Sequence, residues 1–235
     1  MSSKYWHKRD PQSYADLRDR IEVEFPELLF QERGGRVVVS GIYPISDSQG
    51  RAIDLYRIEI IFPPDGPRSG IPVVRETGGR IPWISDRHIE KNGNACLCVP
   101  DEFWYENPDG MDLVDFLRGL VKSFFTGQSL VEAGKSWPQG ERSHGAAGIV
   151  EFYSGIVGTA DPERIMAYLE VLAAPKLRGH WDCPCGNGGR IRNCHLPMLT
   201  ELRKHVRPGT ALDSLEKVRK AGGKGGASRR NDTTR

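Results

Sequence analysis

The segment RVVVSGIYPISDSQGRAIDLYRIEIIF, residues 36 to 62, decides the fold of this chain. Its first part, Arg36 to Tyr43, is rich in β-branched residues, which favour a β-strand. Its last part, Ala52 to Phe62, alternates apolar and polar residues and predicts a second strand. Because the turn-forming residues Ser46 to Arg51 separate the two, we expect them to pair as a hairpin.

A third strand is expected at Ile71 to Glu76, after Pro63 and Pro64 have ended the second strand. The three strands should form an antiparallel meander. In front of it, Ser13 to Phe30 shows apolar residues at helical spacing after a serine that can cap a helix. Pro26 should end or kink that helix.

Helices are also expected after the meander. The span Met111 to Leu130 places apolar side chains on one helical face. Trp137 to Gly158 begins as a turn and continues as a helix, and Met198 to Val206 is helical in pattern. Asp161 to Ala173 begins with a capping aspartate followed by proline, which is typical of a helix start. Together these elements predict an α+β fold.

A long irregular stretch, Thr77 to Asp109, separates the meander from the next helix. Such loops within a compact domain usually carry function. This one contains HIEKNGNACLC, residues 88 to 98, in which Cys96 lies three residues after Gly93 and eight after His88. A thiolate on a loop near a histidine is reactive, so Cys96 is a candidate nucleophile. The alternative interpretation is a small buried thiol under the loop.

The order of helix, meander, proline-rich turn, cysteine loop and long helix resembles the ubiquitin-conjugating enzymes over residues 13 to 158. The stretch IIFPPDGPRSGIPVV is similar to the family's Phe-Pro…Tyr-Pro…Pro-Pro-x-Val pattern, although the tyrosine is absent and Ile71 replaces a proline. Gly93-Asn94-Ala95-Cys96-Leu97 resembles the family's Gly-x-Ile-Cys-Leu, and Trp104 follows at a suitable distance. The resemblance implies a ubiquitin-conjugating-enzyme-like fold, with an N-terminal helix, a meander, a catalytic loop and C-terminal helices.

By this resemblance, Cys96 carries the C-terminal glycine of a donor protein as a thioester and passes it to an acceptor amine. The family's His-Pro-Asn motif aligns with Asp86-Arg87-His88, so His88 occupies the position of the asparagine. A histidine there can donate a hydrogen bond to an oxyanion and, unlike asparagine, can accept a proton. Cys98 is interpreted as a neighbour or, in the alternative, as a redox partner of Cys96, and His144 is a weaker catalytic candidate.

The chain contains no Gly-x-x-x-x-Gly-Lys loop, so we expect the acyl group to arrive already activated from a separate adenylating enzyme. Divergent bacterial members of the family occur in CBASS anti-phage operons, where the modified protein is a cyclic-oligonucleotide synthase. The resemblance thus implies such a synthase as the donor protein. Two alternatives stay open: conjugation of another bacterial ubiquitin-like modifier, and a non-catalytic adaptor that binds a ubiquitin-like partner.

A second chemical signature is CPCGNGGRIRNCH, residues 183 to 195. It supplies Cys183, Cys185, Cys194 and His195, which together match the ligand set of a closed tetrahedral zinc site. Glycines between these residues let the backbone turn tightly. The pattern resembles the SEC-C motif and predicts a structural Zn²⁺.

Composition limits the remaining possibilities. The formal net charge of +2 does not favour a nucleic-acid or membrane partner, and no apolar window is long enough for a transmembrane helix. The polar N-terminus lacks a signal-peptide pattern and the cysteine pattern fits a reducing compartment, so we expect a cytoplasmic protein. The expected regions are a polar N-terminus at 1–12, a ubiquitin-conjugating-like domain at 13–174, a SEC-C-like zinc module at 175–212 and a disordered basic tail at 213–235.

Overall fold

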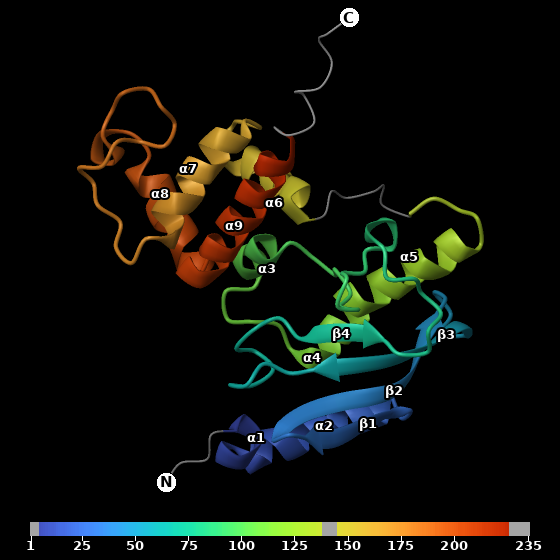
Figure 1. Cartoon of the computed structure of the whole chain (residues 1–235). Helices are drawn as coiled ribbons and strands as arrows, with labels where there is room; N and C mark the ends of the chain where they lie inside the picture. The colour runs from blue at the N-terminus through green and yellow to red at the C-terminus, as the bar shows by residue number, and fades with distance from the viewer. Residues whose placement is uncertain (1–4, 138–144, 226–235) are drawn as a thin grey trace, which may run out of the picture. The chain divides into compact units, whose positions relative to one another are not determined.

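The computed structural model describes the backbone of residues 5–137 and 145–225, and its fold is α+β (Figure 1). The chain divides into two compact units. Unit 1 contains residues 1–97 and 109–141, and unit 2 contains residues 98–108 and 142–235. The four-stranded sheet belongs to unit 1, whereas helices dominate the described part of unit 2.

The sheet is an antiparallel meander in the order β1 (Leu28–Arg33), β2 (Arg36–Ser46), β3 (Ala52–Ile61) and β4 (Val73–Glu76). The last three confirm the expected strands, whereas β1 was not expected. The helix predicted at Ser13 to Phe30 is wrong beyond Glu24, because Pro26 ends it and the chain then turns into β1. Gly34 and Gly35, both at positive φ (56° and 78°), form the tight turn into β2.

The helical segments of unit 1 are α1 (Trp6–Arg9), α2 (Pro11–Glu24), η1 (Ser85–Arg87), α4 (Leu113–Phe116), η2 (Leu117–Val121) and α5 (Lys122–Glu132). The last three follow one another without a break and confirm the helix expected at Met111 to Leu130. The N-cap of α2 is Asp10 rather than Ser13, since the Asp10 carboxylate accepts a hydrogen bond from the Ser13 backbone N–H (3.1 Å). Trp6 and His7 of the expected polar N-terminus are buried in unit 1, whereas residues 8–12 are exposed.

The core of unit 1 lies between one face of the sheet and the helical stretch α4–η2–α5. Ile58 of β3 is fully buried and belongs to the same apolar cluster as Phe116 and Phe125 of the helices. The loop that follows β4 contributes Ile81 and Ile89 to this cluster. The segment that leads to Cys96 is therefore anchored in the core at two points.

Unit 2 is built from α3 (Pro100–Glu106), α6 (Gly145–Val157), α7 (Pro162–Ala173), η3 (Ile191–Asn193), α8 (Leu196–His205) and α9 (Pro208–Gly225). It has its own apolar core, to which α6, α7, α8, α9 and the buried Ile191 contribute. α7 starts at Pro162 behind its cap Asp161, as expected, and α8 confirms the last expected helix. The units do not divide after residue 174, because α6 and α7 share their core with the C-terminal helices.

Two expected irregular regions contain helices. The tail expected to be disordered from residue 213 is helical as far as Gly225, because Leu215 and Val218 are buried in the core of unit 2. Residues 226–235 lie outside the described residues. The stretch from Thr77 to Asp109 includes η1 and α3, and α3 buries Phe103 and Trp104.

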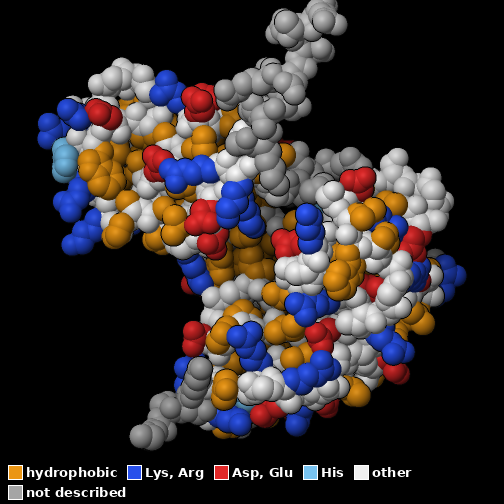
Figure 2. Space-filling model, viewed as in Figure 1, with side chains coloured by type: hydrophobic (Ala, Val, Ile, Leu, Met, Phe, Trp, Pro, Cys, Tyr) orange, Lys and Arg blue, Asp and Glu red, His pale blue; other side chains and the backbone are white. Residues whose placement is uncertain are grey.

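The surface adds two observations. None of the described helices combines the length and the apolar character needed to cross a membrane. Basic and acidic side chains are interspersed over the face of unit 1 seen in Figure 2. That face therefore offers no large patch of a single sign of charge, which is the feature that attracts polyanions.

Candidate functional site

The candidate nucleophile Cys96 ends a tight hairpin of unit 1. Ile89 and Ala95 form an antiparallel bridge, and the Glu90 N–H donates to the Asn94 carbonyl oxygen (2.9 Å). The Ala95 N–H donates to the carbonyl oxygen of Val74 in β4 (2.8 Å), which attaches the hairpin to the sheet.

Gly93 is required at the tip of this hairpin for two reasons. Its φ of 82° lies in the left-handed region that favours glycine. In addition, a Cβ at this position would lie 2.7 Å from the ring of Trp83. The glycine that the sequence places three residues before the cysteine therefore has a backbone role in the fold.

The structure brings His88 and Cys96 together through the backbone. The Cys96 N–H donates to the His88 carbonyl oxygen at 2.8 Å, and the residue Cys96 is half-buried. His88 has φ 50° and ψ 36°, a left-handed conformation that only Asn, Asp, His and Gly adopt with any frequency. Its imidazole is buried and lies 4.8 Å from the indole of Trp137, measured between ring centroids. Position 88 thus carries a backbone requirement that asparagine and histidine can both meet.

A hydrogen-bonded network fixes the chain that leads to His88. The buried carboxylate of Glu76 accepts hydrogen bonds from the N–H groups of Gly78 (2.6 Å), Arg80 (2.9 Å) and Ile81 (3.3 Å). The Arg80 guanidinium donates to both oxygens of Asp54, at 2.7 and 2.8 Å. These bonds hold the pKa of Asp54 at about 2, well below its usual value. The sequence pattern gave no signal for this network, because its members come from separate elements.

The remaining predicted residues around Cys96 have other surroundings. His144 lies outside the described residues. Cys98 is the first residue of the unit 2 segment 98–108. Trp104 belongs to α3 of unit 2, where the Arg207 guanidinium lies 3.4 Å from the centre of its ring. The tryptophan that supports the family resemblance is therefore part of the other compact unit.

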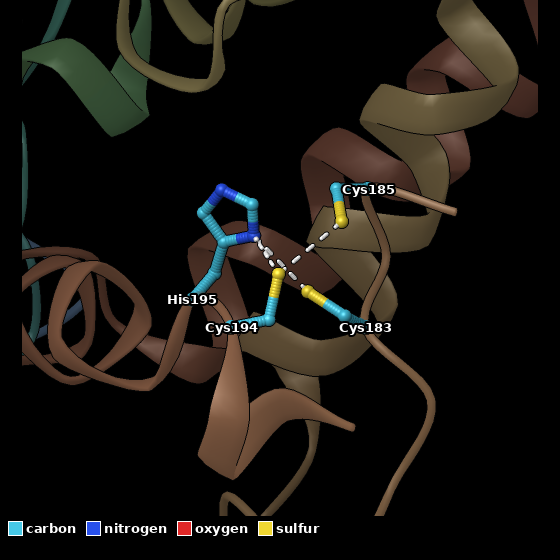
Figure 3. Close-up of side chains that lie close together, drawn as sticks. All are labelled: Cys183, Cys185, Cys194 and His195. Atoms are coloured by element: carbon cyan, nitrogen blue, oxygen red, sulfur yellow. Dashed lines mark hydrogen bonds between the residues drawn. The ribbon is translucent and has the colours of Figure 1, made fainter. Parts of the chain in front are cut away.

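The four predicted metal ligands converge in unit 2, as Figure 3 shows. Their ligand atoms all lie within 4.8 Å of one another. His195 Nδ1 is 3.1 Å from the sulfur atoms of both Cys183 and Cys194, and the sulfur atoms of Cys185 and Cys194 are 3.6 Å apart. Tetrahedral zinc with bonds of about 2.3 Å to sulfur and about 2.0 Å to nitrogen separates its ligand atoms by roughly 3.5–3.8 Å. This cluster can therefore bind a metal ion such as zinc.

A second layer of contacts surrounds the ligands. The Asn187 side-chain amide donates to the Cys194 sulfur at 3.2 Å, and the Tyr168 ring meets the His195 ring edge-on, with centroids 6.2 Å apart. Gly186, at φ 74°, lies against the guanidinium of Arg164. Both Arg164 and Tyr168 belong to α7, so this helix is part of the metal site, although the sequence pattern had grouped it with the conjugating domain.

Burial and local hydrogen bonds affect the ionisation of the thiols in this cluster. Burial raises the pKa of Cys183 to about 11. Burial also opposes ionisation of Cys185, but hydrogen bonds from the Asn187 N–H and from the Cys183 and Cys194 thiols, together with the nearby Arg164 charge, hold the pKa of this thiol below its usual value. Metals bind the thiolate form of cysteine, so a metal ion must displace the Cys183 proton. The affinity of the cluster for the metal will therefore fall at acidic pH.

Comparison of the chain with protein-family models, with curated proteins and with solved structures finds no significant match.

Proposed function

We propose that the protein is a cysteine-dependent acyltransferase of the ubiquitin-conjugating type, with Cys96 as the acyl carrier. The observation that carries the proposal is the geometry of the Cys96 hairpin. The half-buried cysteine ends a hairpin bonded to β4, and its N–H is bonded to the backbone of His88. The order of α2, the four-stranded meander, this hairpin and the long helical stretch ending in α5 supports the same proposal.

The proposed reaction has two steps. In the first, the Cys96 thiolate adds to the thioester carbonyl of an activated donor glycine, and the donor's previous thiol leaves as a thiolate. In the second, an acceptor amine attacks the Cys96 thioester, an amide forms, Cys96 leaves as a thiolate and the amine loses a proton. His88 has two possible roles: donor to the oxyanion of the tetrahedral intermediate, or acceptor of the amine proton.

The proposed partners follow from this chemistry. The donor is a protein with a C-terminal glycine, delivered by a separate adenylating enzyme. A cyclic-oligonucleotide synthase of an anti-phage system is the donor we propose, by resemblance to the bacterial CBASS members of the family. This assignment rests on fold-level analogy, and its test is separate from that of the acyl carrier.

The acyl-carrier proposal is tested with a synthetic probe, the 2-mercaptoethanesulfonate thioester of a glycine-terminated peptide. We expect intact-mass spectrometry of the zinc-loaded full chain to show one peptide attached, and free thiol to remove it. Cys96→Ala should abolish the adduct, whereas the matched control Cys98→Ala, two residues away, should keep it. Acylation of Cys96→Ala at the wild-type rate would contradict the proposal.

The donor is identified by expressing the full chain with the genes that neighbour it in its own genome. A Cys96 adduct that contains the C-terminal peptide of a cyclic-oligonucleotide synthase supports the anti-phage assignment. An adduct with another glycine-terminated protein contradicts that assignment and supports a different modifier. Tight binding of a ubiquitin-like protein with no adduct favours a non-catalytic adaptor.

A further inference from the structure

A pair of reciprocal hydrogen bonds joins α5 to the residue before His88. Gln128 of α5 is fully buried, and its side-chain N–H donates to the Arg87 carbonyl oxygen at 2.7 Å. In return the Arg87 Nε–H donates to the Gln128 side-chain oxygen, also at 2.7 Å. Arg87 reaches Glu132, one helical turn further along α5, at 3.1 Å. Both the main chain and the side chain of Arg87 are therefore attached to this helix.

These bonds restrain the backbone conformation of His88. The peptide group before His88 is held by the bond from Gln128 to the Arg87 carbonyl and by the bond from the His88 N–H to the Ser85 carbonyl (2.8 Å). The peptide group after His88 accepts the hydrogen bond of the Cys96 N–H. His88, in its left-handed conformation, thus connects two restrained peptide groups. The one before it is held by α5, and the one after it is bonded to Cys96.

Gly127, the residue of α5 before Gln128, affects the imidazole of His88 through Trp137. A Cβ at Gly127 would lie 2.6 Å from the indole of Trp137, so the absence of a side chain there lets this indole pack on the helix. The same indole lies 4.8 Å from the imidazole of His88. Consecutive residues of α5 therefore support the backbone and the ring of His88.

We propose that Gln128 is a positioning residue for Cys96. It holds the Arg87–His88 peptide group and, through the His88 carbonyl, the backbone of the nucleophile. The role in acyl transfer rests on the function proposed above. The hydrogen-bonded connection from Gln128 to the backbone of Cys96 does not. Small displacements of a catalytic group lower rates strongly, by as much as about 100-fold for about 1 Å.

The test compares three variants of α5 in the zinc-loaded full chain. Gln128→Met preserves the volume of the side chain and removes both hydrogen bonds. Gln128→Glu keeps an acceptor for Arg87 but cannot donate to the Arg87 carbonyl. Ser123→Ala is the matched control, because Ser123 lies on the same helix and its side chain is exposed to solvent.

Two readouts separate positioning from general stability. We expect Gln128→Met and Gln128→Glu to slow acylation of Cys96 by the peptide thioester about tenfold or more, and Ser123→Ala about twofold at most. We also expect faster amide exchange in the peptide spanning residues 88–98 for both Gln128 variants, with exchange in β2 and β3 unchanged. Wild-type exchange and acylation in Gln128→Glu would overturn the inference, whether or not Gln128→Met folds.

The two proposals fail in different ways. If the wild-type chain is not acylated, the proposed function fails. Amide exchange in residues 88–98 of the Gln128 variants still tests whether Gln128 holds the backbone of Cys96 in place. If Cys96 is acylated and the Gln128 variants match Ser123→Ala in both readouts, only the positioning role is overturned.

Discussion

The hydroxyl of Tyr153 in α6 donates a hydrogen bond to the carboxylate of Asp101 in α3, over 2.7 Å. Ser214 of α9 donates to the other oxygen of the same carboxylate. Asp101 is fully buried, so its two oxygens join three helices of unit 2 through a group that has lost its hydration. A buried carboxylate is tolerated only where such hydrogen bonds replace water.

Removing the Asp101 side chain should destabilise unit 2. Asp101→Ala leaves the hydroxyl groups of Tyr153 and Ser214 buried without an acceptor, at an expected cost of about 2–4 kcal/mol in the free energy of unfolding. Asp101→Asn keeps an oxygen acceptor and should cost less. Denaturant titration followed by hydrogen exchange in α6 and α9 measures both costs. Equal costs for the two variants would mean that the hydrogen bonds contribute nothing.

The same carboxylate makes the stability of unit 2 dependent on pH. Burial raises the pKa of Asp101 above 3.8, so the folded state binds the proton more tightly than the unfolded state. This contribution is complete below the unfolded pKa and is lost as the pH rises through the folded pKa. We expect wild type to lose stability relative to Asp101→Asn as the pH is raised from about 4. A constant difference between the two proteins at all pH values would contradict the assignment.

Asp54 of unit 1 should show the opposite dependence. Its hydrogen bonds from Arg80 lower its pKa to about 2, so its contribution to stability is complete above about 4 and is lost as the pH falls towards about 2. We expect Asp54→Asn to lower the free energy of unfolding at pH 7 by about 1 kcal/mol, a figure reduced for partial solvent exposure. Acid titrations of the two proteins monitored by exchange in β3 should converge near pH 2. A gap that persists there would contradict this explanation.

Local patterns in the sequence predicted the parts of the structure that local physics decides. The alternation in Ala52 to Phe62 gave β3, and the Asp161-Pro162 pair gave the start of α7. The Cys-x-Cys and Cys-His pairs brought their ligand atoms together as expected, because short glycine-rich loops allow few other arrangements.

Other features were missed because they depend on tertiary contacts or because their local signal is short. Only the first half of β1 is apolar; the polar residues Gln31 to Arg33 are part of the strand because the neighbouring β2 supplies the hydrogen bonds. The basic composition of α9 suggested disorder, although Leu215 and Val218 lie on one helical face and are buried. The pairing of Gln128 with Arg87 joins residues 41 positions apart, which no local pattern records.

Metal removal should affect unit 2 selectively. Without an ion, the three thiols and the imidazole of the cluster lose the centre that holds them together. We expect the purified chain to carry one zinc ion by native mass spectrometry, and a strong chelator to speed hydrogen exchange in residues 183–195 and in α7. Exchange in the sheet of unit 1 should not change. Cys185→Ser should abolish metal binding, and the control Cys98→Ser should retain it. Unchanged exchange in the metal-free chain would contradict a structural role for the ion.

Glycine 186 offers a sharper test of the metal loop, because Gly188 is a matched control. Both have positive φ, 74° and 80°, so an alanine at either position is strained by about 1 kcal/mol. Only Gly186 faces a neighbour: its Cβ would lie 1.6 Å from Nη1 of Arg164, whereas nothing lies within 4 Å of a Cβ at Gly188. Gly186→Ala must therefore also displace the guanidinium that lies beside the thiolates.

The expected result is a weaker zinc affinity for Gly186→Ala than for Gly188→Ala, by about tenfold, measured by competition with a chromophoric chelator. Arg164→Ala should weaken zinc binding by a similar factor, because three thiolates and one Zn²⁺ leave a negative charge that the arginine offsets. In the double variant Gly186→Ala with Arg164→Ala, the second substitution should add little to the first. Fully additive losses would show that the two residues act separately. Equal zinc affinities for the two glycine variants would show that displacing Arg164 does not affect metal binding.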